Sequence, residues 1–186
     1  MLFQNCGLYW FVDDVYFGKV GGGSVNKGEL LGNRTPKPFQ RDIDFAEQIG
    51  VYALYANFSL IYVGQVGGGA GNRLLNRLRQ HSNDGFKGRW NRFSWFGLRR
   101  VNANGHVSNE NEAFHPSRQE VLDHVEGIIL QCAEPPLNGQ DGRFGDTLEE
   151  YEQVRHPSLG LTDQQMLREV HKKIFRVKTG LKKKKK

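Results

Sequence analysis

The sequence contains little cysteine and no long apolar run, and both absences exclude classes of protein. Among its 186 residues only Cys6 and Cys132 are cysteines, and they are far apart. Neither a disulfide framework nor a zinc site is therefore expected, and a reducing, cytoplasmic setting is the default interpretation. No apolar run approaches the ~20 residues that a membrane-spanning helix needs. The apolar start at Leu8 to Val12 lacks a basic leader, so it predicts a strand rather than a signal peptide.

The net charge of +6 is distributed unevenly along the chain. Five of these charges belong to the terminal run Lys182 to Lys186, whose composition predicts disorder. Between Arg73 and Arg100 there are eight basic residues and one acid, which is a net charge of +7. A basic stretch within an otherwise balanced chain is typical of a protein that binds a polyanion such as DNA. A solvated charged surface gives the same pattern.

The pattern of apolar residues predicts an α/β (α+β) fold with a small antiparallel sheet flanked by helices. Two aromatic and β-branched runs, Val51 to Ala56 and Leu60 to Gly64, are separated by a short turn and favour an antiparallel hairpin. Ser117 and Thr162 each stand three residues before a glutamate or glutamine, which predicts capping boxes for helices over 117–132 and from 162. The other expected elements are a hairpin over 8–20, a short helix over 42–48, a helix over 72–82 and a strand over 93–101.

Two neighbouring elements carry polar side chains in a pattern that suits catalysis. The first hairpin strand reads Gly-Val-Tyr over residues 50–52, and the second reads Tyr-Val-Gly over residues 62–64. The helix that follows carries Arg73, Arg77 and His81 at intervals of four, so these side chains share one helix face. Each pattern alone also suits an ordinary structure, namely a packed core tyrosine or a surface helix with solvated arginines.

A third element, the helix over 117–132, carries a carboxylate beside its apolar stripe. Glu126 lies at the margin of this stripe, and Pro135 and Asn138 follow the helix. A carboxylate at such a margin can point into a cleft, and the structural alternative is a glutamate on the rim of an amphipathic helix. The stripe consists of Val121, Leu122, Val125, Ile128, Ile129 and Cys132.

Taken in order, these three elements resemble the GIY-YIG nuclease family, with valine in place of isoleucine in both halves of its signature. The resemblance covers residues 50–138 and is closest to the restriction endonuclease-type branch. It implies a GIY-YIG-like nuclease core over 49–140, preceded by an N-terminal extension over 1–48 and followed by a C-terminal helix and basic tail over 141–186. The implied activity is a divalent-metal-dependent endodeoxyribonuclease of restriction or defence type. A structure-specific DNA repair or recombination nuclease and a non-catalytic DNA-binding protein on the same fold are the alternatives.

The resemblance also assigns roles to individual residues. Glu126 would hold one Mg²⁺ or Mn²⁺ ion, which carboxylate and water ligands suit better than zinc. Arg77 would neutralise the charge that develops on the phosphoryl group, with Arg73 as its substitute if the helix register differs. Tyr52 would orient or deprotonate the attacking water.

The remaining expected roles concern positioning, DNA binding and assembly. Tyr62 and His81 would hold the phosphate and the hydroxyl network, and Asn138 would be a positioning residue. Because one constellation cleaves one phosphodiester at a time, we expect two chains, a homodimer, on each cleaved duplex. The dimer surface would be the apolar line of the last helix, which consists of Met166, Val170 and Ile174. The alternative is that this line packs on the domain's own sheet. DNA contacts are expected from the basic residues Arg73, Arg79, Lys87, Arg89 and Arg92.

Overall fold

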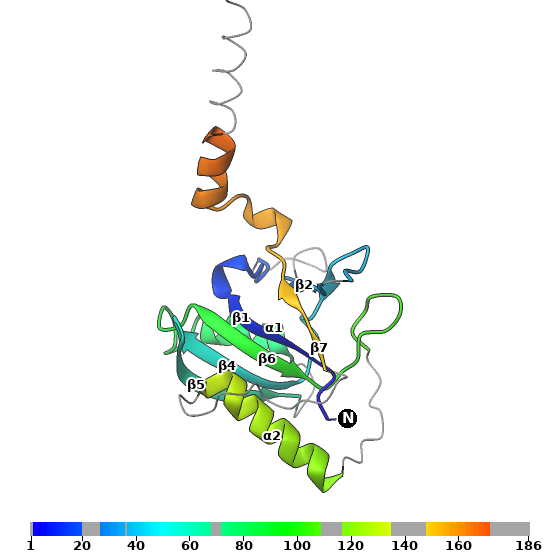
Figure 1. Cartoon of the computed structure of the whole chain (residues 1–186). Coiled ribbons are helices and arrows are strands. Elements are labelled where there is room, and N and C mark those ends of the chain that lie inside the picture. Colours follow the sequence, from blue (N-terminus) through cyan, green and yellow to red (C-terminus); the bar gives the residue numbers. More distant parts are fainter. Residues whose placement is uncertain are drawn as a thin grey trace, which may run out of the picture. The chain divides into compact units, whose positions relative to one another are not determined.

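The computed structural model describes residues 2–19, 27–35, 37–67, 72–108, 117–134 and 148–171. The chain divides into two compact units, Met1–His156 and Pro157–Lys186. The first unit contains a five-stranded sheet with the strand order β5-β4-β6-β1-β7 and a three-stranded sheet with the order β3-β2-β8 (Figure 1). The fold therefore combines α and β elements, as expected.

The larger sheet is mixed rather than purely antiparallel, because β1 and β7 pair in parallel at one edge while its other pairs are antiparallel. Its strands are β1 Asn5–Phe11, β4 Gly50–Ala56, β5 Ser59–Val66, β6 Arg92–Gly97 and β7 Glu149–Glu150. The smaller sheet is antiparallel and consists of β2 Leu31–Asn33, β3 Ile43–Asp44 and β8 Glu152–Gln153. The helices of this unit include α1 Leu74–His81 and α2 Arg118–Ala133.

The expected hairpin over the tyrosine signature is confirmed. β4 and β5 pair antiparallel, with Tyr52 opposite Gly64 and Leu54 opposite Tyr62. A Cβ atom added at Gly64 would collide with the phenol ring of Tyr52. Gly64, which ends the second half of the signature, has no side chain, and the ring of Tyr52 from the first half fills that space.

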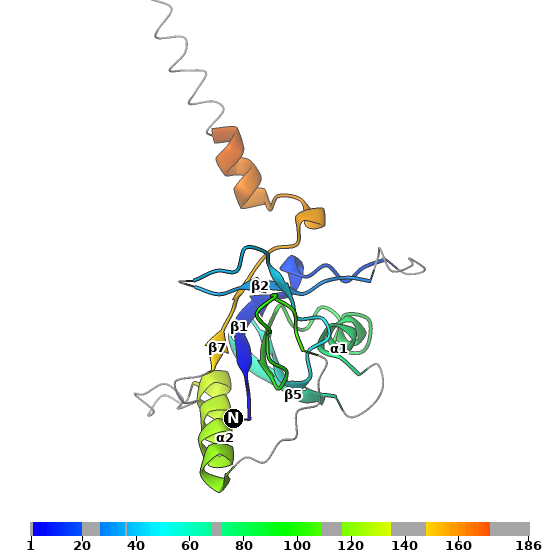
Figure 2. The same cartoon turned by 90° about the vertical axis from the view of Figure 1, so that its right-hand side faces the viewer.

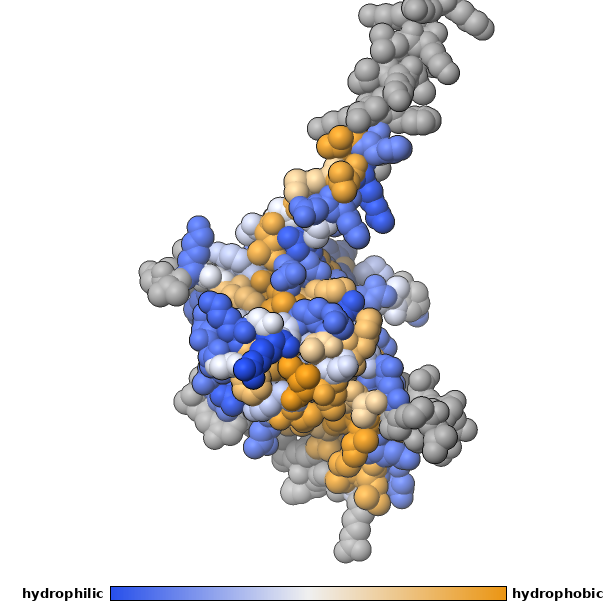
Figure 3. Space-filling model, turned by 90° about the vertical axis from the view of Figure 1, so that its left-hand side faces the viewer, coloured by the Kyte–Doolittle hydropathy of each residue, from blue (hydrophilic) through white to orange (hydrophobic). Residues whose placement is uncertain are grey.

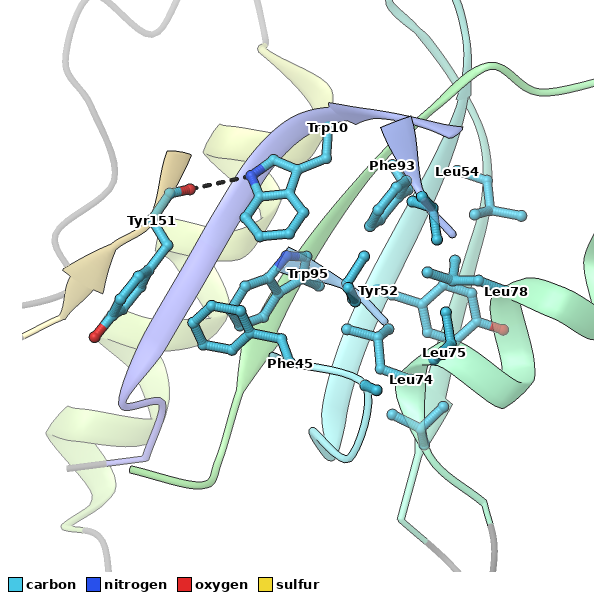
Figure 4. Packing of buried hydrophobic residues seen from close by; sticks show 14 of the residues in the cluster. Trp10, Phe45, Tyr52, Leu54, Leu74, Leu75, Leu78, Phe93, Trp95 and Tyr151 are labelled. Atoms are coloured by element: carbon cyan, nitrogen blue, oxygen red, sulfur yellow. Dashed lines mark hydrogen bonds between the residues drawn. The ribbon is translucent and has the colours of Figure 1, made fainter. Parts of the chain in front are cut away.

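The helices α1 and α2 cover opposite faces of the larger sheet (Figures 1 and 2). On one face, three leucines of α1 are buried in a cluster that includes Tyr52 and Trp95 (Figure 4). On the other face, Cys132 of α2 is buried in a cluster with Ala53 and Tyr55. Because side chains alternate along a strand, neighbouring residues of β4 point to different helices.

Residues 1–48, expected as an extension, contribute a strand to the larger sheet, where β1 lies between β6 and β7. The expected hairpin over 8–20 is wrong, because β1 pairs with β6 and Tyr16 forms only an isolated bridge with Glu29. The expected helix over 42–48 is also wrong, because this segment contains β3 and a turn. There Asp44 Oδ1 accepts hydrogen bonds from the backbone N–H groups of Leu30 and Ala46, which favours the turn over a helix.

Both predicted capping boxes are confirmed. Ser117 and Glu120 exchange side-chain-to-backbone hydrogen bonds at the start of α2. Thr162 and Gln165 do the same before the helical residues 163–171 of the second unit. The helix over 72–82 is also present, as α1, whereas the predicted strand over 93–101 ends earlier, at Gly97.

The apolar stripe of α2 does not pack on the sheet as one surface. Cys132 and His124 are buried, whereas Leu122, Val125 and Ile129 are exposed. Figure 3 shows an apolar area on the side of the molecule that carries β5, to which exposed apolar residues of β5 and α2 contribute. Among the described residues, no helix has both the length and the apolar character that crossing a membrane requires.

The apolar line of the last helix stays a prediction as a dimer surface. Met166 and Val170 are exposed in the second unit. Ile174, the third member of this line, lies outside the described residues.

Candidate active site

The hydroxyl group of Tyr52 is the centre of a polar cluster between the sheet and α1. The side chain of Tyr52 is fully buried, and its ring packs within the cluster beneath α1 (Figure 4). Arg77 Nε donates a hydrogen bond to Tyr52 Oη at 3.2 Å. His81 Nε2 lies 2.8 Å from the same oxygen. One phenol oxygen thus contacts a guanidinium group and an imidazole group at once.

Helix α1 positions both partners of Tyr52 through its own periodicity. Leu74, Leu75 and Leu78 are buried and attach the helix to the sheet. Arg77 and His81 lie one turn apart on an adjoining face, so both reach the same tyrosine. The helix face that Arg77 and His81 were expected to share therefore brings both side chains to the hydroxyl of Tyr52.

Tyr62 completes the side of the cluster that β5 forms. Its ring lies 5.1 Å from the ring of His81 and 5.0 Å from the ring of Phe86, measured between centroids. Hydrogen bonding with Tyr52 and then with Tyr62 raises the pKa of Arg77, so this guanidinium group is firmly charged. The structure thus brings together four of the expected site residues: Tyr52, Tyr62, Arg77 and His81.

Burial is the main influence on the acidity of Tyr52. Removal of the phenol from water raises the pKa of Tyr52 to about 12, and the hydrogen bond from Arg77 opposes this rise. A phenol with such a pKa is almost entirely protonated at neutral pH. Tyr52 therefore holds a proton that it can pass to a neighbouring base, rather than a standing negative charge.

Asp84 belongs to the cluster although sequence reasoning did not select it. Its Oδ2 lies 3.0 Å from His81 Nδ1, on the side of the imidazole ring away from Tyr52. Its Oδ1 accepts a hydrogen bond from the backbone N–H of Phe86 at 2.8 Å. This backbone hydrogen bond, followed by the contact with His81, lowers the pKa of Asp84. The available signal was an aspartate three residues after a histidine at a helix end, a spacing at which the two side chains can meet.

Arg73 and Glu126 lie away from this cluster. Arg73, at the N-cap of α1, forms an ion pair with Glu47 at 3.5 Å. Glu126 is exposed on α2, which covers the opposite face of the sheet from the ring of Tyr52. The structure therefore does not bring Glu126 together with Tyr52, and its role as a metal ligand stays a prediction.

The described residues do not assemble a metal site at the tyrosine cluster. Its one carboxylate is Asp84, which is already hydrogen-bonded to His81. Nowhere in the described ranges do three histidine, cysteine, aspartate or glutamate side chains gather in a way that could hold a metal ion. Asn138, expected as a positioning residue, lies outside the described residues.

The basic residues expected to contact DNA differ in their surroundings. Lys87 and Arg89 are exposed in the turns that follow α1. Arg79 donates hydrogen bonds to the backbone carbonyl groups of Phe17 and Lys27, so its guanidinium group has a structural partner. The guanidinium group of Arg92 stacks on two phenylalanine rings, 3.8 Å from the centroid of Phe11 and 4.4 Å from that of Phe58.

Comparison with known proteins found no matching family model, no matching curated protein and no matching solved structure.

Proposed function

We propose that this chain is an endonuclease that hydrolyses phosphodiester bonds of DNA at the Tyr52–Arg77–His81 cluster. The single observation that carries the proposal is that Tyr52 Oη contacts Arg77 Nε at 3.2 Å and His81 Nε2 at 2.8 Å. Phosphodiester hydrolysis needs a positioned water, a proton acceptor and a cation beside the phosphoryl oxygens, and these three groups supply such functions.

Arg77 is the residue that would bind the phosphate. Its guanidinium group carries five N–H donors in a planar fork, and some of them are used by Tyr52, Tyr62 and Gln80. The remaining donors can contact the non-bridging oxygens of a phosphodiester and stabilise the negative charge that develops there. Exposed basic residues after the helix, Lys87 and Arg89, would contribute sequence-independent contacts with the DNA backbone.

The GIY-YIG resemblance implies Mg²⁺ or Mn²⁺ on Glu126, but the described residues do not bring that carboxylate to the cluster. The chemistry proposed for this chain therefore rests on Tyr52, Arg77 and His81. A restriction or defence role, and two chains on each cleaved duplex, are parts of the same proposal.

A DNA-binding protein without cleavage is the second candidate. The position of Glu126 on the opposite sheet face favours it, because it separates the expected carboxylate from the tyrosine cluster. Such a protein would use the same basic surface and would leave DNA intact.

Incubation of the purified protein with supercoiled plasmid and with branched DNA tests the proposal. Each reaction is run with Mg²⁺, with Mn²⁺ or with EDTA, and products are separated on gels. We expect nicked or linear plasmid with the unsubstituted protein and neither product with the Arg77→Ala variant. Cuts at fixed plasmid positions would favour a restriction enzyme, and cuts only at branches would favour a repair or recombination nuclease. Binding of both DNAs without any product would support the second candidate.

A further inference from the structure

We infer that Asp84 is a positioning residue of this site, and that its carboxylate holds His81 in the tautomer whose Nε2 accepts a proton from Tyr52. The consequence for hydrolysis rests on the proposed nuclease function, whereas the tautomer of His81 does not. Asp84 is not among the site residues that the sequence predicted.

The chemistry of the neighbouring groups determines the direction of each hydrogen bond. Arg77 has no acceptor, so Tyr52 Oη must accept the hydrogen bond from Arg77 Nε. The pKa of Asp84 is lowered, so its side chain is an ionised acceptor at neutral pH and His81 Nδ1 must donate to it. A neutral imidazole with its proton on Nδ1 has an acceptor at Nε2. The hydroxyl of Tyr52 therefore donates to His81 Nε2 across 2.8 Å.

The surroundings of His81 keep this arrangement in place. The imidazole is 2% exposed, so water has little access to it. Phe86 packs against it with centroids 5.0 Å apart, and the backbone N–H of the same Phe86 holds Asp84 Oδ1. The ionisable groups beside the ring include Tyr52 from β4, Tyr62 from β5, Asp84 from the turn after α1, and Arg77 from α1, whose Nε shares Tyr52 Oη with His81. Asp84 is the carboxylate among them, and its lowered pKa keeps it ionised at neutral pH.

The arrangement gives a complete route for the proton of an attacking water. Tyr52 Oη accepts from Arg77 and donates to His81, and Tyr62 is its third hydrogen-bonding partner. An attacking water would take the place of the Tyr62 hydroxyl beside Tyr52 Oη. As the water oxygen bonds to phosphorus, its proton passes to Tyr52 Oη while the phenol proton passes to His81 Nε2. The bond from phosphorus to the leaving oxygen breaks, and that oxygen takes a proton from solvent water. His81 later returns its extra proton to solvent.

Asp84 favours this transfer because an imidazolium beside a carboxylate is more stable than one in an apolar pocket. The route also avoids a free phenolate on Tyr52, which burial disfavours. A carboxylate that orients a histidine in this way acts through the histidine, so Asp84 does not contact the substrate.

Asp84→Asn is the informative variant. The asparagine carbonyl can keep the hydrogen bond from the backbone N–H of Phe86, which turns its NH₂ group toward His81 Nδ1. An NH₂ group donates, so Nδ1 must become the acceptor and the proton must move to Nε2. His81 would then donate to Tyr52 instead of accepting from it. Asp163→Asn, at an exposed aspartate of the second unit, is the matched control.

The full-length protein is examined by long-range ¹H–¹⁵N NMR correlation of the His81 ring, and its DNA cleavage rate is measured beside it. We expect the Nδ1–H tautomer in the unsubstituted protein and in Asp163→Asn, the Nε2–H tautomer in Asp84→Asn, and a loss of about 10²-fold or more in rate for Asp84→Asn alone. An Nε2–H tautomer in the unsubstituted protein would overturn the inference without any variant. An unchanged tautomer in a folded Asp84→Asn protein would also overturn it.

The two proposals fail in different ways in this experiment. A protein that cuts no DNA but shows the expected change of tautomer would refute the nuclease function and support the assignment of Asp84. A protein that cuts DNA at the same rate with and without Asp84→Asn would support the nuclease function and refute the assignment.

Discussion

Replacement of Arg77 by alanine is expected to remove most of the cleavage activity and little of the stability. Arg77 Nε donates to Tyr52 Oη at 3.2 Å, and Arg77 Nη1 donates to Gln80 Oε1 at 2.6 Å. Loss of one preorganised donor to a developing oxyanion costs about 10²–10³-fold in kcat, or ~2.7–4 kcal/mol. Loss of an intramolecular hydrogen bond costs only ~0.5–1.5 kcal/mol of folding free energy. The variant should therefore fold normally and cut slowly.

Arg73→Ala is the matched control, because it removes the same side chain one turn earlier in the sequence. Arg73 forms an ion pair with Glu47 at 3.5 Å, in which the side chain of Arg73 is 21% exposed and that of Glu47 is 67% exposed. The contacts with Tyr52 Oη come from Arg77 and His81, so we expect Arg73→Ala to lower the cleavage rate less than Arg77→Ala. The ratio of the two rates, rather than either rate alone, is therefore the quantity to measure.

The assay is single-turnover cleavage of supercoiled plasmid with protein in excess, with DNA affinity measured by fluorescence anisotropy and folding by thermal unfolding. Both variants should bind DNA and unfold at similar temperatures, while Arg77→Ala cuts at least ~10²-fold more slowly. An inactive Arg73→Ala protein beside an active Arg77→Ala protein would show that the helix register assigned to the catalytic arginine is incorrect.

Three further changes test other parts of the molecule. Glu126→Gln tests the metal role that the GIY-YIG resemblance implies: a metal ligand at this position predicts loss of Mg²⁺-dependent cleavage with DNA binding kept or tightened, since a negative charge is removed, and near-normal cleavage would exclude Glu126 as the metal ligand. Gly64→Ala places a Cβ against the phenol of Tyr52, so we expect about 1–3 kcal/mol of destabilisation by chemical denaturation, and an unchanged midpoint would contradict the packing role. Deletion of Lys182 to Lys186 should weaken DNA binding at low salt and flatten its salt dependence without altering the cut positions, and a changed cleavage pattern would show a positional role for the tail.

The sequence alone determined the local elements around the tyrosine cluster. Alternating aromatic and β-branched residues specify the hairpin of β4 and β5, and the spacing of three leucines specifies which side of α1 packs on the sheet. Arg77 and His81 then share a face because both belong to one short helix. Capping boxes are equally local, and both helix starts that they predict are present.

Tertiary structure decided which distant strands pair, which sheet face α2 covers, and which side chains meet at Tyr52. The pairing of β1 with β6 joins strands more than 80 residues apart, as the hydrogen bond from Tyr9 N to Ser94 Oγ with its separation of 85 residues illustrates. Helical periodicity states which residues of α2 share a side, but it does not state which face of the sheet the helix covers. Packing of Cys132 beside Ala53 and Tyr55 sets that choice, and it separates Glu126 from Tyr52. The hydrogen-bonded chain from Asp84 through His81 to Tyr52 likewise exists only because β4 and α1 pack together, since its two ends lie on different elements.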